Sequence, residues 1–180
     1  MDKYKSKLLR KLKVECSAVE EELSHTVLLF NSATPLFVSS VNSYCDSNSL
    51  KNPLDSLDEK NKEDDFDEFG SGFYSVFRKI VVKSHPDKTT EDKLNSYVGA
   101  TSAKKEKNIN KLISVSKDLN IDLNELSYSD IKDIELSIIK TEEKIEKLKN
   151  SYPYIWYLSS ESKKDFIIKN FVKYFVYPEN

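Results

Sequence analysis

Apolar side chains at heptad spacing between residues 131 and 152 restrict what the chain can fold into. They are Ile131, Ile134, Ile138, Ile145, Leu148 and Tyr152, with Thr141 at the one polar position of the seam. This spacing predicts a helix over 130–150 that ends at Pro153. Three heptads are short for a free-standing coiled coil. We therefore expect this helix to pack antiparallel on another long helix, formed by residues 3–33.

The N-terminal segment also has helical periodicity. Its apolar residues recur at intervals near three and four: Leu8, Leu9, Leu12, Val19, Leu23, Val27 and Phe30. Pro35 is suited to the first turn of a second, shorter helix that reaches Cys45, with Thr34 as its N-cap. The segment therefore predicts a long helix followed by a short one.

The composition favours an all-α fold. The 180 residues include three glycines and five prolines, which argues against a sandwich, a barrel or a nucleotide-cradling α/β fold. The net charge of −2 leaves no excess of positive charge to replace the counterions of a nucleic acid. We expect neither nucleic acid nor a cofactor to bind.

Two cysteines, Cys16 and Cys45, are too few for a disulfide framework or a metal site, and we expect free thiols in a reducing compartment. The N-terminus lacks the apolar core of a signal peptide. The longest apolar run, VLLF at 27–30, is too short to span a bilayer. These features predict a soluble, cytoplasmic protein without a membrane partner.

Residues 46–70 differ in character from their surroundings. Between Asp55 and Glu68 there are eight acidic residues and two lysines, which predicts a solvated linker. Helices are expected again over 71–84, 90–105 and 108–120, with Asp122 and Ser129 as caps further on. A last amphipathic helix over 161–176 would place on one side Phe166, Ile167, Asn170, Phe171, Tyr174 and Phe175. We expect Trp156 to be a core anchor.

The helix from residue 71 must end at Ser84, because Pro86 disfavours the helical conformation of the preceding residue. Four interpretations of His85 follow. Its ring could bind a metal, but no second ligand lies at suitable spacing, since the other histidine is His25. It could serve as a base for Ser84 or Cys45, but no oxyanion-hole signature accompanies it. The remaining two are a plain helix-ending turn and a recognition tip.

The string FRKIVVKSHPDK, residues 77–88, closely resembles the second helix and loop of the J domain, the family of the bacterial co-chaperone DnaJ. Eleven of the twelve positions keep the expected residue type, and Ser84 replaces the usual aromatic. The following helix is similar more loosely, with Leu94, Tyr97, Val98, Ala100 and Ala103 where a J domain packs apolar residues on its second helix. The resemblance covers about 73–120. The chain is similar in this respect to viral proteins of large DNA viruses and to proteins of protists, in which J domains are embedded in lysine- and asparagine-rich chains.

Two features depart from the family. Its first helix, with a Tyr-Tyr-x-x-Leu signature, is missing before residue 73, and the N-terminal helices could replace it in packing. Its aromatic-rich end of the third helix is replaced by TSAKKEKNINKLISVSKDLNI. We therefore expect a variant J-domain hairpin embedded in a larger bundle. The segments would be 1–45, an acidic linker 46–70, the J-like domain 71–125, and a long helix with an aromatic-rich helix over 128–180.

The resemblance implies a function. J-domain proteins bind a 70-kDa heat-shock chaperone of the DnaK type and stimulate its ATP hydrolysis, while performing no chemistry themselves. It implies that the chain is not an enzyme and that partner contacts are made by His85, Pro86 and Asp87, with Arg78, Lys79, Lys83 and Lys88 as electrostatic contacts. The alternative is a structural or assembly protein, for example of a virion, that keeps the J-like hairpin as a scaffold. The N- and C-terminal helices would then contact other proteins.

Overall fold

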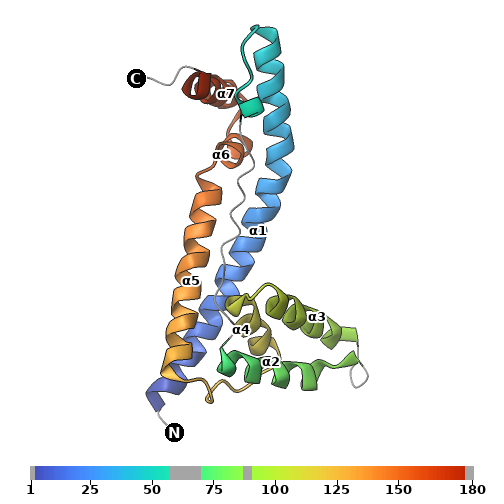
Figure 1. Cartoon of the computed structure of the whole chain (residues 1–180), viewed down its shortest axis with the longest axis vertical. Coiled ribbons are helices and arrows are strands. Elements are labelled where there is room, and N and C mark those ends of the chain that lie inside the picture. Colours follow the sequence, from blue (N-terminus) through green and yellow to red (C-terminus); the bar gives the residue numbers. More distant parts are fainter. Residues whose placement is uncertain (1–2, 57–69, 87–90, 177–180) are drawn as a thin grey trace. The chain divides into compact units, whose positions relative to one another are not determined.

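The computed structural model describes residues 3–56, 70–86 and 91–176. All regular structure in these residues is helical, which confirms the all-α prediction (Figure 1). The elements in chain order are α1 (Lys3–Ser47), η1 (Pro53–Ser56), α2 (Ser71–Ser84), α3 (Glu91–Lys105), α4 (Ile109–Asp118), α5 (Tyr128–Lys149), α6 (Tyr152–Leu158) and α7 (Glu161–Val176). None of these helices combines the length and apolar character needed to cross a membrane.

The chain divides into two compact units, and each unit is discontinuous in sequence. The first unit comprises Met1–Leu23 and Asp64–Glu143, and the second comprises Ser24–Glu63 and Lys144–Asn180. Helices α1 and α5 therefore contribute residues to both units. Most of the acidic stretch expected to be a linker, 57–69, lies outside the described residues.

Helix α1 is continuous from Lys3 to Ser47, so the prediction of a break with a second helix starting at Pro35 is wrong. Thr34 does not act as a cap, because its hydroxyl donates to the carbonyl of Phe30 (2.7 Å), as threonines inside helices do. Packing explains the continuity: four side chains at regular spacing are buried in the second unit, namely Ala33, Phe37, Val41 and Cys45. The free energy gained by burying these side chains outweighs the cost of the backbone hydrogen bond that Pro35 removes.

The first unit has a single core that joins distant parts of the sequence. Seventeen residues form it: Leu9, Leu12, Cys16 and Val19 of α1; Phe73, Val76 and Ile80 of α2; Ala100 and Ala103 of α3; Leu112 and Ile113 of α4; Ile121, Leu123 and Leu126; and Ile131, Ile134 and Ile138 of α5. The start of α1 thus supplies apolar surface to α2, the packing role expected of the N-terminal segment.

Within the first unit α1 and α5 run parallel, so the antiparallel prediction is wrong. Lys5, near the start of α1, lies over the ring of Tyr128 at the start of α5 (5.8 Å). Further along both helices, the thiol of Cys16 contacts Asn110, which in turn donates to Thr141. The colours of Figure 1 show the same direction. A heptad pattern reads alike in both directions and does not determine how two helices are oriented.

A buried polar residue fixes α4 between these two helices. Asn110 is fully buried, and its amide nitrogen donates to the carbonyl of Ser137 (3.0 Å) and to the hydroxyl of Thr141 (2.9 Å). Its side-chain oxygen accepts from the thiol of Cys16 (3.4 Å). Because each polar group of this amide has a partner, its burial does not leave an unsatisfied group in the core. The network explains the polar position in the heptad seam.

The N-cap of α5 is Ser127 rather than the predicted Ser129, and it forms a capping box with Asp130. The backbone N–H and hydroxyl of Ser127 donate to the carboxylate of Asp130 (both 2.7 Å), and the N–H of Asp130 donates back to the Ser127 hydroxyl (3.1 Å). The helix ends at Lys149, and Pro153 lies in the first turn of α6 instead of ending α5. Asp122 makes a local turn by accepting from the N–H of Asn124 (2.9 Å).

The second unit has its own aromatic core. Phe37 meets the rings of Trp156 (5.8 Å) and Phe171 (5.1 Å) edge to face, which confirms Trp156 as a core anchor. Helix α7 has the predicted bounds, and the side named from the sequence coincides only in part with its buried face, since Phe171 is buried and Ile167 packs against the core. The helix buries Ile168, Phe171 and Val172 and leaves exposed Phe166, Tyr174 and Phe175.

Candidate functional site

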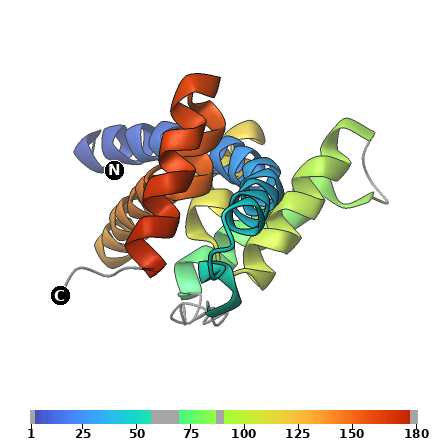
Figure 2. The ribbon, with the colours of Figure 1, turned by 90° about the horizontal axis from the view of Figure 1, so that it is seen from above.

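Helix α2 carries the candidate site. It packs on the core with one face and on α3 with one edge. Phe73, Val76 and Ile80 are buried on one face, which anchors the helix in the core of the first unit. One edge meets α3: the Lys104 ammonium lies over the rings of Tyr74 (5.4 Å) and Phe77 (4.8 Å). Helices α2 and α3 lie side by side in both views (Figure 1, Figure 2).

The end of α2 agrees with the sequence prediction. Ser84 is the last helical residue, and His85 leaves the helix with φ −59° and ψ 132°. This extended conformation is the one that a following proline imposes. Pro86 is exposed. The predicted contacts Asp87 and Lys88 lie outside the described residues.

His85 rests against the first turns of α3. Its ring meets that of Tyr97 edge to face, with 5.7 Å between centroids and an interplanar angle of 75°. This contact, together with the one from Lys104 to Phe77, shows that α2 and α3 are antiparallel. The half-buried imidazole is therefore held against a neighbouring ring at the end of α2.

The three predicted cations of α2 do not form one surface. Lys79 pairs with the carboxylate of Glu125 (2.7 Å), and Lys83 donates to the carbonyl of Leu119 (3.1 Å). Both partners belong to the connection between α4 and α5. Arg78 is exposed, and no hydrogen bond or ion pair holds it within the described part of the chain.

The ion pair of Lys79 is reinforced by a serine. The hydroxyl of Ser75 also donates to Glu125 (2.9 Å), and the hydrogen bonds from Lys79 and Ser75 lower the pKa of this carboxyl. Because Glu125 is exposed, solvent screens the pair and keeps it weak. A partner carboxylate could therefore compete for Lys79.

Comparisons of the chain with protein-family models, with curated proteins and with solved structures find no match.

The expected packing of α3 on α2 is correct only in part. Ala100 and Ala103 are fully buried, whereas Leu94 and Val98 are exposed. Glycine at position 99 lets α3 approach α4, because an added Cβ would lie 3.1 Å from the Val115 side chain. Helix α3 therefore divides its contacts between α2 and α4.

Sequence reasoning did not identify a pocket between the start of α1 and the connection from α4 to α5. Arg10 and Lys13, three residues apart, share one face of α1 at this pocket. A basic surface on this face of α1 could have been predicted from the spacing of these two residues in the sequence. The third cation, Lys117, could not be placed from the sequence, because only the fold brings α4 beside α1.

Proposed function

We propose that the chain is a J-domain-type co-chaperone that binds a 70-kDa heat-shock chaperone and stimulates its ATP hydrolysis. The observation that carries the proposal is the string at residues 77–88 together with its setting. The His85–Pro86 step follows the last residue of a helix that is paired antiparallel with the next one. The segment would act as a rigid tip that another protein can recognise.

The geometry at His85 supports a binding role. Pro86 fixes the backbone, and the ring of Tyr97 restricts the imidazole, so little conformational entropy remains to be lost on docking. An imidazole can donate or accept a hydrogen bond at the surface of a partner. Stimulation would follow if the complex favours one conformational state of the ATPase.

The cations support a division of roles. Arg78 is exposed on α2 and can pair with a carboxylate in two-pronged geometry. Lys79 and Lys83 would have to exchange their present contacts with Glu125 and the Leu119 carbonyl for contacts with a partner. We therefore assign the main electrostatic contact on this helix to Arg78, with the two lysines contributing mostly to long-range steering.

The test is the steady-state ATPase rate of a DnaK-type chaperone with and without the full chain. His85→Gln removes the proposed contact, and His25→Gln, at the exposed second histidine, is the matched control. Stimulation that His85→Gln abolishes and His25→Gln retains would support the proposal. Stimulation that is absent, or that survives His85→Gln, would contradict it.

A second candidate, a structural or assembly protein, is favoured by apolar side chains on α6 and α7. Phe166 and Tyr174 expose 64% and 67% of their surface, and four more large residues are exposed: Tyr152, Ile155, Leu158 and Phe175. Light scattering separates the candidates. A stable oligomer that Phe166→Ser together with Tyr174→Ser dissociates would favour assembly, and a monomer would count against it.

A further inference from the structure

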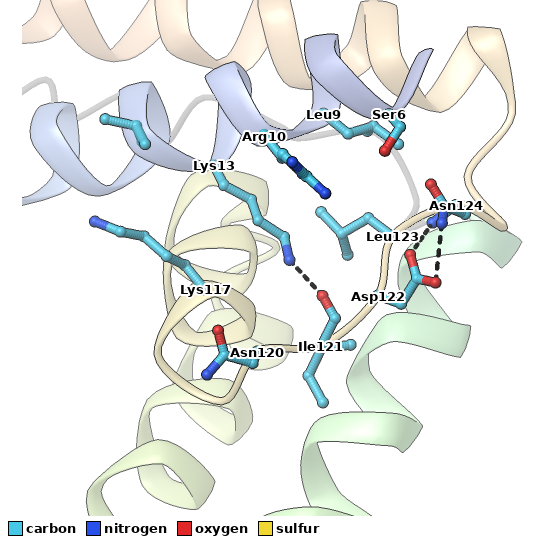
Figure 3. Close-up of a pocket in the computed structure, with 11 residues that line it drawn as sticks. Ser6, Leu9, Arg10, Lys13, Lys117, Asn120, Ile121, Asp122, Leu123 and Asn124 are labelled. Carbon is cyan, nitrogen blue, oxygen red and sulfur yellow. Dashed lines mark hydrogen bonds between the residues drawn. The ribbon is translucent and has the colours of Figure 1, made fainter. Parts of the chain in front are cut away.

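A pocket of about 520 Å³ lies within the first unit, between the start of α1 and the connection from α4 to α5 (Figure 3). Its lining includes three cations: Arg10 and Lys13 from α1, and Lys117 from α4. It includes one carboxylate, that of Asp122. The chain as a whole carries a net charge of −2, so this local excess of positive charge departs from its average.

The carboxylate in the lining is already engaged. Asp122 accepts from both the N–H and the side-chain amide of Asn124, each at 2.9 Å, and Figure 3 shows the acid joined to this amide. The Asp122 carboxylate attracts the Lys13 ammonium electrostatically but does not form an ion pair with it. The positive charge of the pocket is therefore only partly compensated by the protein itself.

Lys13 is held in the wall. Its ammonium donates to the carbonyl of Ile121 (Figure 3), which ties α1 to the connection. Desolvation lowers its pKa, and the charges of Arg10 and Lys83 act in the same direction. Like charges brought together in this way destabilise one another, and a bound anion would relieve that repulsion.

Arg10 and Lys117 are available to a ligand. No hydrogen bond or ion pair of either side chain is formed within the described residues. Arg10 points across the pocket toward Leu123 in Figure 3. A planar guanidinium can bind two oxygens of one anion at once. The Lys117 side chain points away from Arg10 in Figure 3, and a change of its rotamer would bring its point charge to the same anion.

We propose that this pocket binds a small anion carrying two or more phosphoryl groups. Arg10 would bind one phosphoryl group, with Lys117 and Lys13 neutralising the other. Leu9 and Leu123 supply apolar walls that reduce screening by water. The volume lies within the range of small-molecule sites. The eleven lining residues include no aromatic side chain on which a base could stack, so recognition would rest on the phosphoryl groups.

Isothermal titration calorimetry of the full chain with pyrophosphate tests the proposal. Arg10→Gln removes the main ligand, and Arg78→Gln, at the other arginine of the chain, removes the same charge from the exposed side of α2. We expect Arg10→Gln to raise the Kd about tenfold or more. Arg78→Gln should leave the Kd within about twofold, because exposed charges beyond the pocket are screened by salt.

Lys117→Gln gives an independent reading if Arg10→Gln folds poorly, and it should also weaken binding. Citrate, a carboxylate anion of comparable charge, should bind more weakly than pyrophosphate. Three results would overturn the proposal: a Kd for pyrophosphate weaker than about 1 mM, equal weakening by Arg10→Gln and Arg78→Gln, or citrate binding as tight as that of pyrophosphate.

Discussion

Ser84 is the residue at which the string 77–88 departs from the J-domain pattern, and its surroundings explain the departure. It is fully buried, and its hydroxyl donates to the carbonyl of Ile80 (2.8 Å). A small side chain suits this position at the end of α2, where an aromatic ring would have to displace packed neighbours.

Ser84→Phe should therefore lower the free energy of unfolding by about 1–3 kcal/mol through overpacking. Ser84→Ala, which removes the hydrogen bond to the Ile80 carbonyl, should cost less than Ser84→Phe, about 1.5 kcal/mol or below. Urea unfolding followed by circular dichroism measures both values. If Ser84→Phe were as stable as the natural sequence, the position would have room for an aromatic ring and the packing argument would be wrong.

Cys16 shows how burial controls the chemistry of a residue. Both cysteines are buried free thiols, as expected from their number. Burial, and then the nearby charges of Glu20 and Glu15, raises the pKa of Cys16 to about 12. Because the folded-state pKa lies above the unfolded one, this group stabilises the fold below about pH 9 and loses that contribution as the pH rises toward 12.

Alkylation of a Cys45→Ala variant, in which Cys16 is the remaining thiol, tests this. At pH 8 the thiolate fraction of Cys16 should be about a thousandfold lower in the folded protein than in urea, and its reaction with iodoacetamide correspondingly slow. Equal rates in the folded and unfolded protein would show that the thiol is accessible and its pKa ordinary.

At the scale of the element, α1 poses the sharpest question because it passes through Pro35. A proline inside a helix costs about 3 kcal/mol relative to alanine, whereas at the first position it is well tolerated. A helix that continues through Pro35 and a helix that begins at Pro35 therefore predict opposite effects of Pro35→Ala on stability.

Pro35→Ala should raise the free energy of unfolding by about 2 kcal/mol, since part of the gain is offset by the greater freedom of the unfolded chain. Leu36→Ala, at the exposed next residue, is the control and should change it by less than about 0.5 kcal/mol. Urea unfolding measures both. A neutral or destabilising Pro35→Ala would indicate that a new helix starts at the proline.

Local signals explain which elements could be predicted. The end of α2 at Ser84 follows from Pro86, and Asn108 starts α4 by accepting from the N–H of Lys111 (2.9 Å). The continuity of α1 and the direction of α5 depend on packing between distant segments, which local patterns do not contain. Which face of α7 is buried also depends on such packing, since Phe171 is buried whereas Phe166 and Tyr174, on the side named from the sequence, are exposed.

At the scale of the whole molecule, the candidate site belongs to the first unit, whose core extends well beyond residues 71–125. Leu9 and Leu12 of α1 and Ile131 and Ile134 of α5 share one core with α2. The sequence was sufficient to predict that α2 ends at Ser84, just before His85 and Pro86, because the residues that set this end are consecutive. It was not sufficient to show that Lys79 and Lys83 contact the connection between α4 and α5, nor that Lys117 and Arg10 line the same pocket.

The central claim is that the tip formed by His85 and Pro86 acts on the ATPase of another protein. The ratio of chaperone ATPase rates with and without saturating amounts of the full chain tests this most directly. We predict a ratio well above one for the natural sequence and for His25→Gln, and a ratio of one for His85→Gln. A ratio of one for the natural sequence, or an unchanged ratio for His85→Gln, would contradict the account.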